Sequence, residues 1–186
     1  MNKKILWITE TAIMLALLVT LQALTKPVGQ LVTGSCVNTV LAVSALVGGL
    51  GCGLTIALIS PILAFLLGIA PQILTVPAIM VGNAVFVVAL YFLADRKGNN
   101  LIKQATAWLV AAAAKFAALY LIVVQLICGV LSESLLASGT LKEPMLKALP
   151  ATFSYPQLFT ALIGGAIALL ITPILIKALH KGIKEK

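Results

Sequence analysis

The sequence predicts an all-α integral membrane protein with six transmembrane helices and with its N-terminus and C-terminus both cytoplasmic. Apolar residues make up 61% of the 186 residues and charged residues only 10%, with a mean hydropathy of +1.14. Soluble domains are roughly 45–50% apolar and about 25% charged. The apolar residues form runs long enough to cross a bilayer core of about 30 Å, and basic residues cluster at the ends of the runs. We therefore expect a single membrane domain over residues 1–186, with no second soluble domain.

Glycine, proline and polar residues divide the chain into six apolar segments. The expected helices cover residues 5–24, 31–47, 51–67, 73–93, 105–131 and 155–175. The breaks between them lie at residues 26–29, 48–53, 68–71, 95–100 and 132–154. The first apolar run is longer than the core of a secretory signal and no A-x-A cleavage site follows it, so we expect a retained helix.

Positive charge decides how residues 31–68 are divided. Two helices there have about 19 residues each, near the lower limit of about 17 for a span. With six spans, nine of the 13 Lys and Arg residues fall on the cytoplasmic side, and Lys115 falls in the membrane. Only Lys26, Lys142 and Lys147 fall outside. Because cytoplasmic loops carry an excess of basic residues, this asymmetry favours six spans over one merged helix. It also explains the net charge of +8 without a nucleic-acid partner.

The residue groupings that membrane enzymes use are missing from the sequence. The single aspartate, Asp95, and the single histidine, His180, both lie outside the expected helices, so no intramembrane carboxylate pair or Ser/His pair is expected. The three cysteines are scattered and form no CxxC motif, which argues against a metal site or a disulfide framework. Glycines at 29 and 34 have the spacing of a nucleotide-binding loop, but the required lysine does not follow. We expect no enzyme activity and no cofactor.

Polar residues remain in the expected helices where a small molecule could meet them. The candidate substrate-binding residues are Asn38, Asn83, Lys115, Gln125, Gln157 and Thr160. By the direction of each helix, all except Asn83 and Lys115 fall near the outer face, which is the pattern of an outward-open cavity. Each residue could instead form a hydrogen bond between helices. For Gln72 and Tyr155 we favour such a bond or an interfacial anchor.

Lys115 interrupts the longest apolar run, residues 104–131. A helix that starts near residue 105 places it about 15 Å into the apolar layer, roughly at mid-depth. A lysine there costs about 2.5–3.5 kcal/mol on insertion scales, so a partner should offset the cost. Two partners are possible: Glu10, in an ion pair within the protein, or an anionic ligand that Lys115 would bind.

Four short stretches carry a resemblance to a known family. They are TAIMLA at 11–16, VTGSCVN at 32–38, LISPILAF at 58–65 and PAIMVGNA at 77–84. Together with chain length, six expected spans and a basic N-terminus, they make the chain resemble the substrate-binding S-components of energy-coupling factor (ECF) vitamin transporters over nearly its full length. Ala12 and Ala16 match the AxxxA signature that this family carries on its first helix.

The resemblance implies a multi-pass protein of a bacterial cell membrane that captures a vitamin or related micronutrient outside the cell. Such a protein docks on a transmembrane coupling subunit carried by two ATPase subunits, which hydrolyse the ATP. Ala12 and Ala16 would form the docking surface. A loop at residues 26–35 and the segment 132–154 would close over the ligand.

Two other functions remain open. Gly53–Leu63 and Gly165–Leu175 share the pattern GxxxxLIxPIL, which an inverted-repeat stand-alone transporter or channel would explain. Two independent proline kinks would explain it as well. A non-catalytic membrane scaffold subunit would need no ligand at all.

Overall fold

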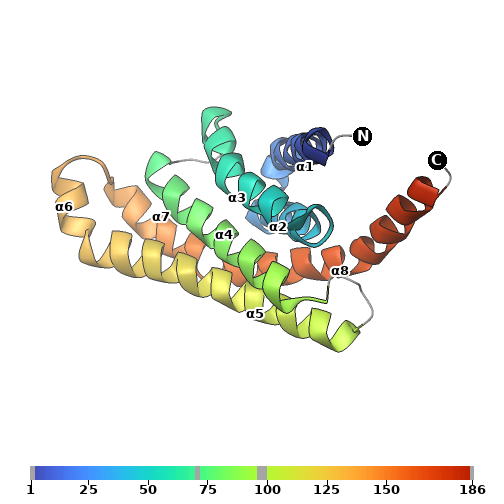
Figure 1. The fold of residues 1–186 in the computed structure, drawn as a ribbon. Coiled ribbons are helices and arrows are strands. Elements are labelled where there is room, and N and C mark those ends of the chain that lie inside the picture. The colour runs from blue at the N-terminus through green and yellow to red at the C-terminus, as the bar shows by residue number, and fades with distance from the viewer. Residues whose placement is uncertain (1–2, 70–71, 96–99, 185–186) are drawn as a thin grey trace.

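The fold was obtained as a computed structural model, which describes residues 3–69, 72–95 and 100–184 (Figure 1). All regular secondary structure in these residues is helical. Arg96, Lys97 and Lys186, which the charge argument uses, lie outside the described residues. The expected all-helical class is therefore confirmed for the described part of the chain.

The described helices follow the expected segments closely. In chain order they are α1 (Lys3–Thr25), η1 (Lys26–Val28), α2 (Gln30–Val43), η2 (Ser44–Gly48), α3 (Gly49–Leu66), η3 (Ile73–Thr75), α4 (Val76–Leu93), α5 (Leu101–Leu119), η4 (Tyr120–Val130), α6 (Ser132–Ala137), α7 (Glu143–Phe153) and α8 (Tyr155–Lys184). The short elements η1 and η3 are 3₁₀-helices, whereas η2 and η4 are π-helices that continue α2 and α5.

Five helical stretches of the described residues are long and apolar enough to cross a membrane, as expected for an α-helical multi-pass membrane protein. They are Lys4–Val28, Gln30–Leu66, Ile73–Leu93, Leu101–Val130 and Glu143–Ala178. The second stretch has 37 residues, and a straight helix of that length would measure about 55 Å, nearly twice the bilayer core.

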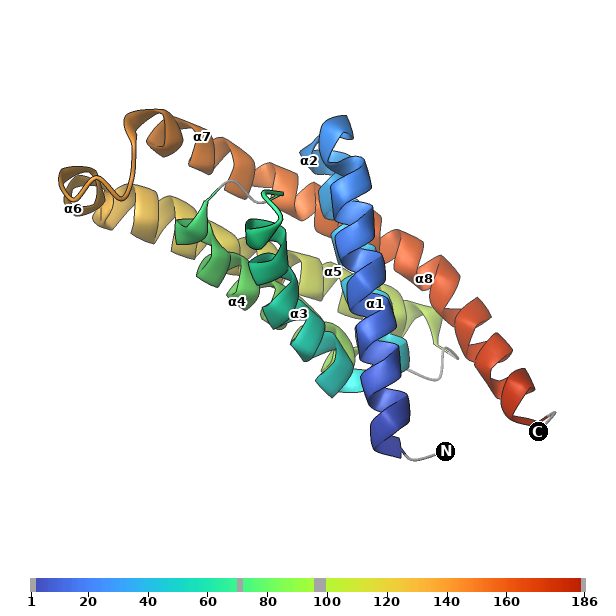
Figure 2. The same ribbon diagram turned by 90° about the horizontal axis from the view of Figure 1, so that it is seen from above.

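Gly49 interrupts this second stretch. Its φ of 85° lies in the left-handed region, which residues other than glycine rarely adopt, and it separates η2 from α3. The two halves also have different neighbours, since α2 packs mainly on α8 and α3 packs mainly on α4. In Figure 2, α3 lies to one side of α1, whereas α2 runs behind α1. The glycine therefore turns the chain within a run that is helical on both sides.

One expected loop is wrong. We expected a loop over residues 26–35, but Lys26–Val28 form η1 and α2 begins at Gln30, so nine of these ten residues are helical. Gly29, with a φ of 115°, carries the turn almost alone after the short η1 helix. The segment 132–154 also contains two helices, α6 and α7, with a turn at Gly139 between them.

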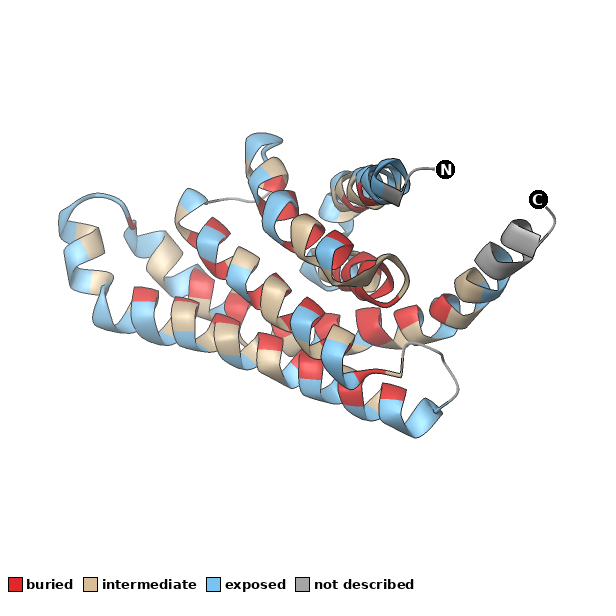
Figure 3. Cartoon of the chain, viewed as in Figure 1, coloured by how far each residue is buried: buried red, intermediate tan, exposed pale blue. Residues whose placement is uncertain are grey.

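The helices pack around a central apolar core that α2, α3, α4, α5 and α8 share. Its most buried large side chains include Leu41, Ile56, Phe86 and Leu90. A second cluster joins α4, α5 and η4 to α7 at one end of the molecule. Among the five long helical stretches, the one formed by α1 and η1 is the least buried, and exposed residues dominate the surface of α1 in Figure 3. The start of α1 and the end of α8 lie at the same end of the molecule in both ribbon views (Figures 1 and 2).

Candidate ligand-binding site

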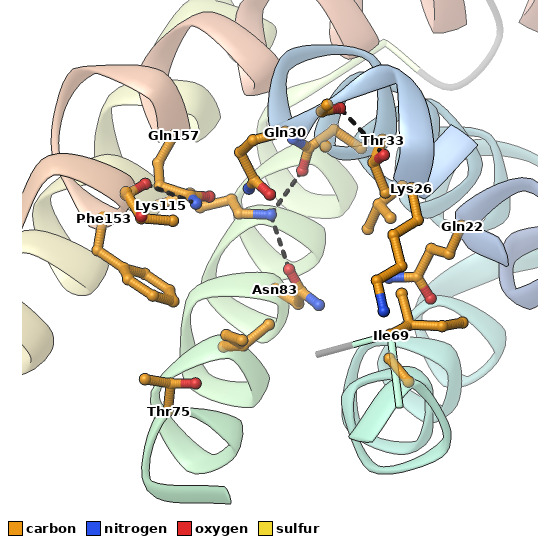
Figure 4. A pocket seen from close by; sticks show the side chains of 17 residues that line it. Gln22, Lys26, Gln30, Thr33, Ile69, Thr75, Asn83, Lys115, Phe153 and Gln157 are labelled. Carbon is orange, nitrogen blue, oxygen red and sulfur yellow. Dashed lines mark hydrogen bonds between the residues drawn. The ribbon is translucent and has the colours of Figure 1, made fainter. Parts of the chain in front are cut away.

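A pocket opens where several helix ends meet. The end of α1, the start of α2, the end of α3, the start of α4 and the junction of α7 with α8 all contribute to it, together with the middle of α5. Its cavity has a volume of about 200 Å³. Its polar lining residues are Gln22, Lys26, Gln30, Thr33, Asn38, Thr75, Asn83, Lys115, Thr152 and Gln157. Figure 4 shows Lys115 and Asn83 between Gln22 and Lys26 on one side and Phe153 and Gln157 on the other.

Lys115 forms the centre of the site and is 3% exposed. Its Nζ donates to Asn38 Oδ1 at 2.5 Å and to Asn83 Oδ1 at 2.7 Å (Figure 4). It also lies 5.5 Å from the centre of the Phe86 ring, within the range of a cation–π contact. Three helices, α2, α4 and α5, therefore meet at one ammonium group.

A chain of hydrogen bonds holds Asn38 in the orientation that Lys115 needs. Asn38 Nδ2 donates to Thr160 Oγ1 at 3.3 Å, and Thr160 Oγ1 donates to the Gln157 carbonyl at 3.1 Å. An ammonium can only donate, so the amide oxygen of Asn38 must face it and the amide nitrogen must face Thr160. The start of α8 thus fixes a residue of α2 that in turn binds a residue of α5.

The structure brings five of the six candidate substrate-binding residues together. Asn38, Asn83, Lys115 and Gln157 line the pocket, and Thr160 lies directly behind Asn38. Gln125 lies apart from them, is exposed and donates to Tyr120 Oη at 3.2 Å.

The alternative ion pair between Lys115 and Glu10 does not form among the described residues. Both hydrogen bonds of Lys115 to these residues end on amide oxygens. Glu10 instead lines a second cavity of about 190 Å³, with residues of α1, α2, η2, α3 and α8. Lys115 and Glu10 line different cavities. The Lys115 side chain bonds to residues of α2 and α4, whereas Glu10 lies with η2 and Cys52.

Several lining residues were not among the candidates. Gln22, Gln30 and Thr33 come from the end of α1 and the start of α2, and Phe153 comes from the last turn of α7. Gln22 and Gln30 carry the same amide group as the candidates, and their position beside the break at residues 26–29 was a usable signal. The sequence gives no such signal for Phe153, because an aromatic residue near a helix end is equally common where it packs against the core.

The charge of the pocket is positive. Lys115 lies within it and Lys26 lies at its rim, where Lys26 Nζ donates to the Gly68 carbonyl. None of the described residues that line the pocket is acidic. A buried ammonium whose only partners are neutral dipoles keeps an uncompensated charge, so the site favours an anion and disfavours a cation.

No protein-family model, no curated protein and no solved structure matches the chain. The chemistry of the site therefore follows from its own residues: one buried ammonium, oriented amides and an apolar wall.

Proposed function

We propose that the protein is the substrate-binding S-component of an ECF-type importer, which captures a vitamin or related micronutrient outside the cell. The observation that carries this proposal is the pocket around Lys115, which is built from helix ends that meet on one side of the bundle. A scaffold subunit has no use for a buried ammonium held by oriented amides, since such a group costs stability unless a ligand offsets it. No cofactor or catalytic residue enters the proposal.

A six-span topology supports an outward-facing pocket. In the proposal, the break at Gly49 lets α2 and α3 cross separately. The start of α1 and the end of α8 lie at one end of the molecule, which is the arrangement that six crossings would give. With both termini cytoplasmic, the α1–α2, α3–α4 and α7–α8 junctions fall outside. These are the junctions that line the pocket.

The uncovered face of α1 supports docking on a coupling subunit. Ala12 and Ala16 are both exposed, and Ile13 and Leu17 beside them are 61% and 45% exposed. Small residues four apart allow another transmembrane helix to approach closely. In the proposal, this face of α1 binds the coupling subunit, and two ATPase subunits power release of the ligand inside the cell.

Purification from native membranes tests the proposal. We expect ATPase subunits to co-purify with the wild-type chain, and Ala12→Arg or Ala16→Arg to abolish the association while small-molecule binding is kept. Ala113→Arg is the matched control, because Ala113 and Ala117 form an exposed pair with the same spacing on α5. Transport by the chain alone in vesicles without ATPase would identify a stand-alone transporter instead. Failure to retain or bind any small molecule would leave only a scaffold role.

A further inference from the structure

We propose that the ligand is a small organic monocarboxylate whose carboxylate binds Lys115 and Asn83 and whose remaining part carries hydroxyl or amide N–H groups. This inference rests on the proposed binding function and adds the chemical class of the ligand. It follows from the unused hydrogen-bonding groups of the pocket, from its charge and from its volume.

Two hydrogen-bond donors remain unused on adjacent groups. An ammonium has three N–H groups, and Lys115 donates two of them to Asn38 and Asn83, so one is left. Asn83 is 1% exposed, and its Nδ2 has no hydrogen-bond partner among the described residues. Asn83 Oδ1 accepts from the Lys115 ammonium, and in Figure 4 the Nδ2 of the same amide lies on the side of the amide that faces away from the ammonium. The ammonium N–H and the amide N–H belong to adjacent groups, and each can donate to an oxygen of a carboxylate bound between them.

The charge of the site matches a single negative charge. Lys115 is the buried cation of the pocket, and Lys26 is exposed and already donates to the Gly68 carbonyl. A monoanion leaves the buried region neutral. A phosphate dianion would leave one charge without a partner in a region that disfavours it, and a cation would meet like charge.

The volume and the other lining residues of the pocket indicate the size and the functional groups of the rest of the ligand. The cavity of about 200 Å³ exceeds the ~150 Å³ that accommodates benzene and is smaller than the ~300 Å³ at which pockets for drug-sized ligands begin. Val37, Ile79 and Phe153 supply apolar surface. Among the lining side chains that are buried or half-buried, two amide oxygens have no hydrogen-bond donor from the described residues: Gln22 Oε1, and Gln157 Oε1, whose amide nitrogen is bonded to the Thr152 carbonyl. Hydroxyl or amide N–H groups on the ligand would satisfy both acceptors.

Fractionated yeast extract is a suitable probe because it contains small carboxylates of many kinds. An anion-exchange resin at pH 7.5 separates it into a retained anionic fraction and a flow-through of neutral and cationic compounds. We expect only the anionic fraction to raise the unfolding temperature of the purified, ligand-free chain. Methyl esterification of that fraction should abolish the effect, because it removes the carboxylate charge, and phosphatase treatment should leave it unchanged.

Each other outcome has a definite meaning. Stabilisation by the flow-through, or an effect that phosphatase removes, would overturn the monocarboxylate inference and leave the binding function standing. Absence of stabilisation by every fraction would overturn the inference together with the proposed function.

Two variants locate the carboxylate. Lys115→Met and Asn83→Asp should each raise the amount of anionic fraction needed for half-maximal stabilisation about 30-fold or more. Asn83→Asp places a carboxylate beside the ammonium, which neutralises the site within the protein, so this chain should fold even where Lys115→Met does not. Gln125→Ala is the control, because Gln125 is exposed and lies outside the pocket. Unchanged affinity in Asn83→Asp would place the anion elsewhere and overturn the assignment.

Discussion

Among the described residues, the partners that hold Lys115 in the interior are all uncharged. Two amide oxygens and the face of Phe86 surround its ammonium, and none of these groups carries a charge. Such partners lower the cost of burial without cancelling the charge, so the charge stays available to a ligand. An ion pair with Glu10 would have used that charge within the protein. Asparagine in place of aspartate at positions 38 and 83 therefore leaves the lysine charge for the ligand that we propose.

We expect Thr160 to affect ligand binding through its hydrogen bond with Asn38. Thr160→Val keeps the shape of the side chain and removes the oxygen that accepts from Asn38 Nδ2, so a buried donor loses its partner. We expect the unfolding free energy to fall by about 1–3 kcal/mol, and the amount of anionic fraction needed for half-maximal stabilisation to rise about 5-fold. Titration by thermal unfolding measures both. Thr106→Val is the matched control, since the exposed Thr106 hydroxyl bonds only to Ile102 of its own helix. If Thr160→Val and Thr106→Val changed stability and ligand affinity equally, the orientation of Asn38 would not contribute to binding.

Most residues of the candidate site could be predicted from the sequence, but the hydrogen bonds between them could not. Asn38, Asn83 and Lys115 could be selected because polar groups in apolar helices are costly and need a reason. That both asparagines bond to Lys115 could not be foreseen, because the pairing depends on how α2, α4 and α5 rotate against one another. In a regular helix with 100° per residue, Gln125 would point about 80° away from Lys115. The chain becomes a π-helix from Tyr120, where the period changes, so that angle does not apply.

At the scale of elements, glycine explains both the breaks and the closest contacts. Gly29, Gly49 and Gly68 have φ values of 115°, 85° and 67°, and each ends a helix or separates two. These breaks could be predicted because glycine adopts such values without strain. The extent of each break could not: a single glycine turns the chain where we expected a loop over 26–35, because the residues after Gly29 form helical hydrogen bonds at once.

Gly164 sets the distance between α2 and α8. A Cβ at this position would lie 2.5 Å from the Ser35 carbonyl oxygen and 2.6 Å from Asn38 Cβ, and backbone cannot move aside cheaply. We expect Gly164→Ala to lower stability by about 1–3 kcal/mol and also to weaken ligand binding, because it displaces Asn38. Thermal unfolding with and without the anionic fraction measures both effects.

Gly129 is the control for that substitution. Its nearest atom to an added Cβ is 3.6 Å away, an ordinary contact, so Gly129→Ala should leave stability and binding close to wild type. If Gly164→Ala lowers stability and leaves affinity unchanged, the helix contact and the site are independent.

At the scale of the whole molecule, the pocket and the termini lie at opposite ends of the helices. The end of α1, the end of α3 and the start of α8 line the pocket, whereas α1 starts and α8 ends at the other end of the bundle. Hydropathy and charge were enough to predict a multi-pass helical protein. They could not show that three separate junctions share one cavity, because that depends on packing between helices distant in sequence.

The accessibility of single cysteines tests the orientation of the whole chain. We expect Ser138→Cys, between α6 and α7, to react with a membrane-impermeant maleimide in intact cells, and Leu101→Cys, at the start of α5, to react only after permeabilisation. Both positions are exposed, and Leu101 is 74% exposed, so protection would come from the membrane and not from burial. The background is a chain with Cys36, Cys52 and Cys128 replaced by alanine. A merged α2–α3 span with the N-terminus inside would reverse the two results, placing Leu101 outside and Ser138 inside. The pocket side of the bundle would be outside for α1 and α2 but inside for α7 and α8, and an outward-facing site could not form.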